Sequence, residues 1–255
     1  TVGMHYTGMA AARFDDNSFC GAALTGLSGK GLDNLVLVTS LAVLIIALLT
    51  SLLDARLEAR TAVLADSLTL ANQELTHLAL HDMLTGLPNR TLLADRIQQA
   101  IQAVREQGGC FALMFIDLDG FKPVNDAFGH HMGDQLLREV GLRLREDLRS
   151  QDTLARIGGD EFVLLVQLTQ PDDAMGLAER QVGLINRTFK VAEHELKISA
   201  SIGIAMFPGN GVNPQELLMN ADAAMYHAKG MGKNGYSFFD VSMNTNARKQ
   251  LQLLQ

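Results

Sequence analysis

The chain has 255 residues, enough for one or two domains with a substantial core, and a formal net charge of −7. This acidic balance argues against a protein that coats polymeric nucleic acid, since such domains usually carry a basic patch, but it allows a single bound nucleotide. The two cysteines, Cys20 and Cys110, lie in a loop-like and a strand-like segment, which favours a reducing compartment over a disulfide framework.

The N-terminal segment, residues 1–34, begins with TVGMHYTGMAAA and has no initial methionine, which suggests a fragment of a longer protein. Its MHYTGMAA phrase resembles the repeated motif of the MHYT membrane sensor domains. The resemblance implies that Met4, His5 and Met9 could hold copper, and their donor atoms are soft or borderline ligands that suit it. A histidine at a membrane edge can equally be capped for structural reasons, so both interpretations stay open.

An apolar run without charged side chains follows in residues 35–53, LVLVTSLAVLIIALLTSLL. Its length is about that needed to cross the hydrocarbon layer as a helix, so we predict a transmembrane helix. A buried helix of a soluble domain is the alternative, but such helices normally carry a polar stripe that this run lacks. Basic residues flank both ends of the run, so the charge bias does not decide its orientation.

Residues 54–79 contain no proline or glycine, and leucine and other apolar residues recur among charged ones. This amphipathic spacing predicts a helical signalling stalk that either pairs with a second copy or remains a lone linker helix. Gly86 and Pro88 end the helical pattern, and we place the start of a soluble domain at about residue 80.

The soluble domain is expected to span residues 80–240 with alternating helices and strands. Apolar periodicity and turn signals predict helices at 90–106, 126–148, 172–189 and 214–229, and strands at 110–116, 153–157, 161–167, 196–207 and 236–239. This order, with one hairpin inside it, is typical of an α/β sandwich of the βαββαβ kind.

Acidic residues stand at the ends of the predicted strands. Asp117 and Asp119 close the run FALMFIDLD, and Asp160 and Glu161 follow two glycines in ARIGGDEFVLLV. Taken alone, the second pair is ordinary hairpin chemistry. In a βαββαβ sheet the first strand lies beside the hairpin, so Asp117 can approach both acids, and converging carboxylates need a cation such as Mg²⁺. For Asp119 a turn-capping role is the better interpretation.

Three phrases resemble the GGDEF family of diguanylate cyclases in order and spacing: FIDLDGFKPVNDAFGHHMGDQLL, RIGGDEF and ADAAMYHAKGMGKNGY. The resemblance implies a fold similar to the core of class III nucleotidyl cyclases and the polymerase palm. It also implies that two GTP molecules, one on each protomer of a homodimer, condense to cyclic di-GMP and pyrophosphate, with Mg²⁺ or Mn²⁺ as the metal, two ions per active site. Because GTP is cytosolic, the domain would face the cytoplasm from the inner membrane of a bacterium.

The resemblance assigns metal binding to a set of oxygen donors: Asp117, the backbone carbonyl of Leu118, Asp160 and Glu161. Glu161 alternatively deprotonates the attacking 3′-hydroxyl, and that choice stays open.

The substrate-binding positions implied by the resemblance are of three kinds. Asn125 and Asp134 match the pair that reads guanine, since an amide and a carboxylate satisfy donors and acceptors of a purine edge. Phosphate binding matches Lys122, which counts among the catalytic residues, together with Lys229 and Lys233. Many relatives carry arginine at the last position, so lysine loses a bidentate fork there. The glycines whose turn lets backbone approach the phosphates are Gly158 and Gly159.

A regulatory site is implied by Arg149 and Asp152, an RxxD phrase five residues before the signature, with Arg180 where some relatives have a second arginine. The family uses this position for inhibition by cyclic di-GMP, and arginine fits phosphate and guanine edges bidentately. By itself RSQD would be a surface phrase at a helix end.

Three functions therefore compete. The first is a membrane-bound diguanylate cyclase, which the complete set of acids favours. The second is a GTP- or cyclic di-GMP-binding regulatory module of a phosphodiesterase, because residues 241–255 resemble a linker to an EAL domain. The third is a sensor fragment whose soluble part only dimerises.

Overall fold

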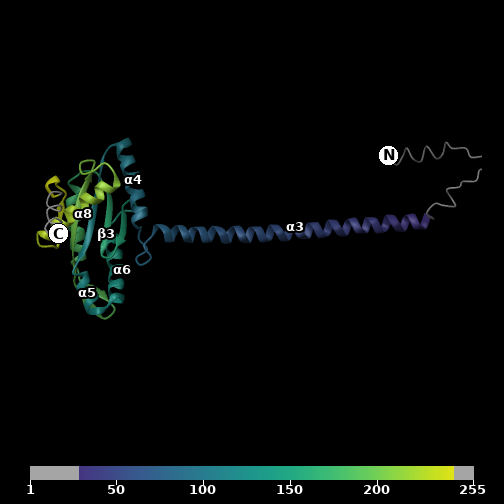
Figure 1. The fold of residues 1–255 in the computed structure, drawn as a ribbon, viewed down its shortest axis with the longest axis horizontal. Coiled ribbons are helices and arrows are strands. Elements are labelled where there is room, and N and C mark those ends of the chain that lie inside the picture. The colour runs from purple at the N-terminus through teal and green to yellow at the C-terminus, as the bar shows by residue number, and fades with distance from the viewer. Residues whose placement is uncertain (1–28, 244–255) are drawn as a thin grey trace, which may run out of the picture. The chain divides into compact units, whose positions relative to one another are not determined.

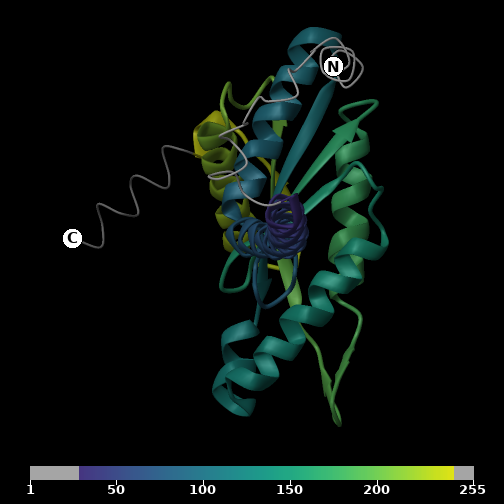
Figure 2. The ribbon, with the colours of Figure 1, turned by 90° about the vertical axis from the view of Figure 1, so that its right-hand side faces the viewer.

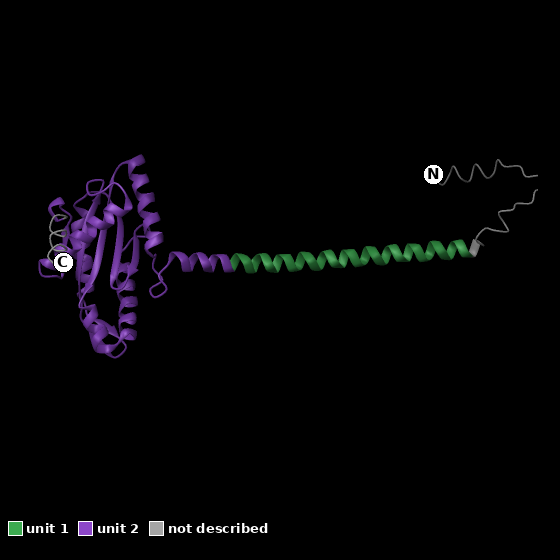
Figure 3. Ribbon diagram, viewed as in Figure 1, with its two compact units in different colours: residues 1–70 green, residues 71–255 purple. Residues whose placement is uncertain are grey.

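The computed structural model describes residues 29–243 of the chain. The candidate copper ligands Met4, His5 and Met9 lie outside these residues, as does most of the expected linker. The chain divides into two compact units, Thr1–Leu70 and Ala71–Gln255 (Figure 3).

Helix α3, Gly29–Leu80, contains both the predicted transmembrane segment and the predicted stalk (Figure 1). Its apolar part has a mean hydropathy of 2.7, so the helix is long and apolar enough to cross a membrane. The hydroxyls of Thr39 and Thr50 donate to backbone carbonyls one turn earlier at 3.0 and 2.9 Å, which satisfies these polar groups within the helix. No glycine or proline stands between residues 32 and 80, which explains why the helix is unbroken.

The second unit is built on a five-stranded sheet in the order β2-β3-β1-β6-β7. The strands are β1 Cys110–Asp119, β2 Thr153–Gly158, β3 Glu161–Leu168, β6 Ser199–Phe207 and β7 Gly235–Phe238. Central strand β1 pairs antiparallel with β3 and β6, and β7 adds a parallel edge strand to β6. The predicted βαββαβ fold is confirmed, with β7 as an addition.

Helices cover both faces of the sheet (Figure 2). Helices α4, Arg90–Gln107, and α8, Pro214–Gly230, lie on one face, and α6, His130–Glu146, and α7, Asp173–Ile185, lie on the other. Alternate residues of β1 serve the two cores: Leu113 and Phe115 pack toward α4 and α8, whereas Met114 and Ile116 pack toward α6 and α7. The alternation also decides which face receives the acids that follow.

Gly203 of β6 lets α8 approach the sheet closely. A β-carbon there would overlap the backbone of α8 at the carbonyl of Ala221 and the amide of Met225. A larger residue would push α8 away from the sheet, and with it the lysine near its C-terminal end.

The predicted helix at 126–148 is wrong in its extent. The structure has two helices, α5, Phe121–Phe128, and α6, which separate at Gly129 with φ of 82°. This left-handed conformation is accessible to glycine at little cost, so the chain turns there although the apolar periodicity continues.

The hairpin of β4, Phe189–Val191, and β5, His194–Leu196, was not predicted from the sequence. Residue 189 was assigned to a helix that in fact ends at Ile185, and residue 196 to a strand that in fact begins at Ser199. The turn contains no glycine or Asn-Gly pair to signal a hairpin. Ala192 takes the positive φ of 51° instead.

Candidate active site

The acids meet where β1 ends beside the β2–β3 hairpin. Asp117 stands directly opposite Glu161 in the antiparallel register. The hairpin turn uses Gly158 and Gly159 with φ of 152° and 49°, and a β-carbon on either would meet no atom within 4 Å. The space beside the two glycines is therefore free, as a close approach of the backbone to phosphates would require. Asp160 follows the turn directly.

Lys229, near the end of α8, forms an ion pair with Asp117, with 2.7 Å between Nζ and Oδ1. Burial raises the pKa of the Asp117 carboxyl, the carboxylates of Asp160 and Asp119 raise it further, and the Lys229 ammonium opposes the shift. The lysine expected to bind phosphate thus neutralises an expected metal ligand.

A further acid, Asp222 on α8, belongs to this site and was missed by the sequence analysis. Burial raises its pKa, Lys229 opposes the rise, and Asp117 adds to it. The pKa of Glu161 is likewise raised by burial, by Asp117 and by Asp222. The sequence did hold a signal for Asp222. It stands seven residues before Lys229 on one helix, a spacing that returns to the same helix face.

Glu161 and Asp222 share the wall of a cavity of about 280 Å³. The other side chains there are one cation, Arg90, and the apolar Phe115, Ile157, Leu218 and Met219. Arg90 lowers the pKa of Glu161 in opposition to the neighbouring acids. The acids therefore border a partly apolar cavity, which strengthens their electrostatic interactions.

The expected guanine-reading residues lie on the α5–α6 arm. The Oδ1 atom of Asn125 is buried and accepts no hydrogen bond from the described residues. A β-carbon on Gly133 of α6 would overlap that same oxygen and would lie 3.1 Å from Phe121. Because residue 133 is glycine, the Asn125 amide has the space that it occupies. Asp134, the next residue, is half-buried.

The other two lysines of the expected phosphate set, Lys122 and Lys233, are exposed and form no ion pair with any residue between 29 and 243. Lys233 has a positive φ of 63° in the turn before β7. That turn is held by Asp119, whose Oδ2 accepts a hydrogen bond from the backbone N–H of Asn234 at 3.1 Å.

Asp119 has a structural role. It is buried and accepts hydrogen bonds from the hydroxyls of Ser199 and Ser201 at 3.0–3.1 Å as well as from the turn before β7. The sequence predicts a turn-capping acid there, but these partners come from the neighbouring strand and the turn before β7 rather than from its own turn. Nothing in the sequence marked Ser199 and Ser201 as the partners of Asp119.

An ion pair absent from the sequence predictions supports the hairpin from behind. Arg156 of β2 donates to both oxygens of Asp82 at 2.9 and 2.8 Å, and its guanidinium also donates to the carbonyl of Gly159 at 2.7 Å. Asp82 in turn accepts hydrogen bonds from the N–H and hydroxyl of Thr85. The turn after α3 is thereby tied to the glycine turn beside the acids.

Asp82→Asn is expected to lower the free energy of unfolding by about 2 kcal/mol at neutral pH, the scale of hydrogen bonds to a charged group. Burial raises the pKa of Asp82, but the hydrogen bonds from Thr85 and Arg156 outweigh it and the net pKa is lowered. This stabilisation is therefore present above the unfolded pKa of about 4 and is lost as the pH falls through the folded value.

Urea unfolding of the parent and Asp82→Asn between about pH 3 and pH 7 measures the effect. The two curves should converge at the acid end, and Asp126→Asn, an exposed acid, serves as the control. A difference that does not change with pH would show that the charge of Asp82 contributes nothing.

The RxxD phrase lies in the turn between α6 and β2. The N–H of Arg149 donates to Oδ2 of Asp152 at 2.9 Å, and Oδ1 of Asp152 is buried without a partner in the described part of the chain. Arg180 of α7 bonds to the same connection, two residues before Arg149. It donates to Asp147 at 3.1 Å and to the carbonyl of Gly176.

Hard oxygen donors fit Mg²⁺, but within residues 29–243 no three His, Cys, Asp or Glu side chains gather closely enough to hold a metal ion. Mg²⁺ is usually bound by one or two carboxylates together with waters and substrate phosphates. Asp117 and Glu161 supply the two carboxylates of such a site. The described residues do not supply a complete set of protein ligands.

Comparison with known proteins decides the family. Residues 79–235 match the family described as "Diguanylate cyclase, GGDEF domain". The chain belongs to the GGDEF family. Residues 1–62 match "Bacterial signalling protein N terminal repeat", the MHYT family. Both resemblances seen in the sequence are confirmed.

Named relatives support the assignment of this GGDEF chain. It is 60% identical over 253 residues to the bifunctional diguanylate cyclase/cyclic di-GMP phosphodiesterase MucR of Pseudomonas aeruginosa, covering 99% of this chain and 37% of MucR. The chain thus spans little more than a third of that relative.

Solved structures agree with the fold of the GGDEF unit. The GGDEF domain of TpbB from P. aeruginosa is 34% identical, with a TM-score of 0.64, covering 66% of this chain and 99% of that one. The coiled coil and GGDEF domain of DgcB from Caulobacter crescentus, in complex with c-di-GMP, is 27% identical, with a TM-score of 0.67 and coverage of 73% and 98%.

Proposed function

We propose that this chain is a membrane-bound diguanylate cyclase that joins two GTP molecules into cyclic di-GMP. One observation carries the proposal: β1 and the hairpin bring Asp117 opposite Glu161, and α8 adds Lys229 at 2.7 Å from Asp117. Two acids and an adjacent cation at the open end of a sheet suit phosphoryl transfer, where developing charge on both sides must be stabilised.

Four oxygen donors would hold the metal: Asp117, the carbonyl of Leu118, Asp160 and Glu161. When bound, Mg²⁺ or Mn²⁺, expected as two ions per site, would supply charge stabilisation and activation of the attacking oxygen. Leu118 is fixed by its N–H, which donates to the carbonyl of Asp160 at 3.3 Å. This backbone hydrogen bond joins the end of β1 to the hairpin. It therefore holds the oxygen ligands of the two segments near one another.

The reaction balances as two identical steps. In each, a bond forms between a 3′-oxygen of one GTP and the α-phosphorus of the other, the bond to pyrophosphate breaks, and the hydroxyl proton leaves. Glu161 is suited to accept that proton, because a carboxylate with a raised pKa is a stronger base. Lys122, Lys229 and Lys233 would hold the phosphates, while Asn125 and Asp134 would orient the guanine.

A homodimer is required by this chemistry, since one protomer carries one GTP site and two substrates must face each other. The stalk part of α3 exposes Leu57, Leu64, Leu68 and Leu75, apolar side chains that a second helix could cover. We place the GGDEF unit in the cytoplasm, below the inner membrane of a bacterium, because its substrate is cytosolic.

The test is incubation of the detergent-solubilised chain with GTP and Mg²⁺, followed by chromatography for cyclic di-GMP and pyrophosphate. Both products should form, and Asp160→Ala should form neither. GTP binding without product would favour the second candidate, a regulatory module of a phosphodiesterase. The bifunctional name of MucR, of which this chain spans 37%, is the observation in its favour.

Product inhibition is proposed to act through Arg149 and Asp152, with Arg180 as a further contact. Arg149→Ala should raise the concentration of cyclic di-GMP that halves the rate by about tenfold, since a bidentate arginine contact to phosphate is lost. Initial rates with added product measure this, and Arg187→Ala is the control. Equal inhibition of Arg149→Ala and the parent would rule out this site.

A further inference from the structure

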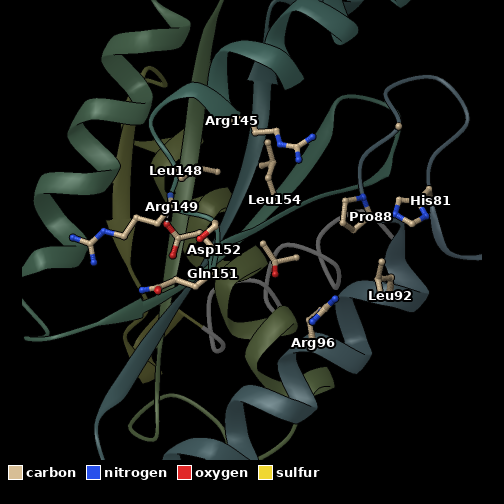
Figure 4. A pocket seen from close by; sticks show the side chains of 13 residues that line it. His81, Pro88, Leu92, Arg96, Arg145, Leu148, Arg149, Gln151, Asp152 and Leu154 are labelled. Carbon is tan, nitrogen blue, oxygen red and sulfur yellow. Dashed lines mark hydrogen bonds between the residues drawn. The ribbon is translucent and has the colours of Figure 1, made fainter. Parts of the chain in front are cut away.

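Helix α6 has different neighbours at its two ends. At the C-terminal end, Arg145 and the RxxD phrase border a cavity of about 470 Å³, which belongs to the proposed inhibition site (Figure 4). At the N-terminal end, α6 joins α5 at Gly129, and the two helices form the α5–α6 arm that carries Asn125 and Asp134. The expected guanine-reading residues thus lie at the end of α6 opposite to the RxxD phrase.

The outer end of α5 contacts an element outside the arm. Phe121 and Val124 of α5 are buried, whereas Phe128, the last residue of the helix, is 45% exposed. The ring of Phe128 lies against the ring of His194, with 4.9 Å between the centroids and an angle of 49° between the planes. Ring centroids about 4.5–7 Å apart are typical of attractive aromatic pairs. Because His194 begins β5, this contact joins the arm to the β4–β5 hairpin.

The β4–β5 hairpin is anchored at its base. It is a two-stranded sheet of its own, and Figure 2 shows it projecting beyond the main sheet at the same end of the unit as α5. Its inward side chains, Phe189, Val191 and Leu196, are buried in the core. Arg143 of α6 lies 3.5 Å from the centroid of the Phe189 ring and donates to two carbonyls just before β4 at 2.7 and 3.2 Å. The hairpin therefore presents His194 from a fixed support.

The position of Asn125 depends on the same end of α5. Within residues 29–243 no hydrogen bond or ion pair joins α5 to the hairpin, so the contact between the two rings is what holds them together. Asn125 stands one turn before Phe128, and its backbone carbonyl accepts the N–H of Gly129 at 2.8 Å. A shift of Phe128 would therefore move the turn that carries the Asn125 amide. Oδ1 of that amide is buried without a donor in the described part of the chain, and an N–H of guanine could supply one.

We infer that His194 is a positioning residue for guanine recognition: its ring holds Phe128, and the last turn of α5 passes that restraint to the Asn125 amide. The inference rests on the proposed function only in that Asn125 reads the base. A displaced amide loses its hydrogen bonds to guanine while the phosphate contacts remain, so the loss of affinity falls on guanine nucleotides. Selectivity for the base thereby depends on a hairpin outside the five-stranded sheet.

Binding is tested by titrating GDP and ADP separately, with Mg²⁺, into the full 255-residue chain in detergent micelles. GDP carries the guanine base but lacks the pyrophosphate leaving group, so its binding is measured without turnover. His194→Ala should bind GDP about threefold to tenfold more weakly than the parent, the scale of one aromatic pair, and should bind ADP as the parent does. His194→Phe keeps an aromatic ring and should match the parent. Glu193→Ala, at an exposed position of the same turn, is the matched control.

Two further readouts separate positioning from a general structural effect. In a Phe128→Ala background, His194→Ala should cause no additional loss of GDP affinity, because both changes remove the same contact. In initial-rate measurements His194→Ala should raise KM for GTP by the factor seen with GDP and leave kcat near that of the parent. The inference is overturned by unchanged GDP binding in His194→Ala, by equal losses for GDP and ADP, or by losses that add in the double variant.

The two proposals fail differently, because GDP binding needs no turnover. A chain that makes no cyclic di-GMP but loses GDP affinity selectively in His194→Ala would refute the proposed function and support the role of His194. Formation of cyclic di-GMP together with unaltered GDP binding in His194→Ala would do the reverse.

Discussion

Glu161→Gln is expected to lower kcat for cyclic di-GMP formation about a thousandfold, the scale for loss of a general base or of a metal-binding carboxylate. The same change should raise the free energy of unfolding. Burial and the neighbouring Asp117 and Asp222 raise the pKa of Glu161, so its charge opposes folding near neutral pH, and a neutral amide removes that repulsion. An active-site carboxylate is thus held at a cost in stability.

Pyrophosphate release over a range of Mg²⁺ concentrations, with urea unfolding alongside, checks both parts. Glu193→Gln, which changes an exposed acid in the β4–β5 turn, is the matched control. A higher Mg²⁺ requirement would assign Glu161 to metal binding, whereas a lower kcat at unchanged Mg²⁺ requirement would assign it to proton transfer. A rate near that of the parent would refute both roles.

Gly133→Ala is expected to raise KM for GTP by tenfold to about a hundredfold while changing stability little. The added methyl group would overlap Oδ1 of Asn125, and the end of that flexible side chain can move away without disturbing the backbone. The amide would then leave the position from which it is proposed to read guanine. The ratio of kcat/KM for GTP to that for ATP should fall as well.

Gly183→Ala is the matched control. It is also a helical glycine, in α7, and a β-carbon there would meet no atom within 4 Å. It should stabilise the chain by about 0.5–1 kcal/mol through reduced backbone entropy and leave KM unchanged. If Gly133→Ala behaves the same way, Asn125 does not read the base.

The convergence of acids was predictable because two local signals agreed with one topology. An apolar strand ending in Asp117 and a glycine hairpin ending in Glu161 become neighbours in any βαββαβ sheet, and the register confirms it. The family motifs added the identity of the chemistry. Burial of Asp117 follows from its place at the end of a central strand.

Contacts between distant side chains were not predictable. Arg156 and Asp82 are 74 positions apart, and each looks like an ordinary surface residue in the sequence. The pairing of Lys229 with Asp117 depends on how closely α8 approaches the sheet at Gly203, which no periodicity reveals. The ion pair of Arg180 with Asp147 likewise joins two helices that are distant in the sequence.

The ion pair between Lys229 and Asp117 has a thermodynamic consequence for ligand loading. The ammonium of Lys229 lies 2.7 Å from Oδ1 of Asp117, so a divalent cation that binds this carboxylate, as proposed, would compete with it. An ammonium displaced from Asp117 can pair instead with the triphosphate of GTP. Metal and GTP should therefore each increase the affinity for the other by the same factor, because a coupling free energy between two ligands is reciprocal.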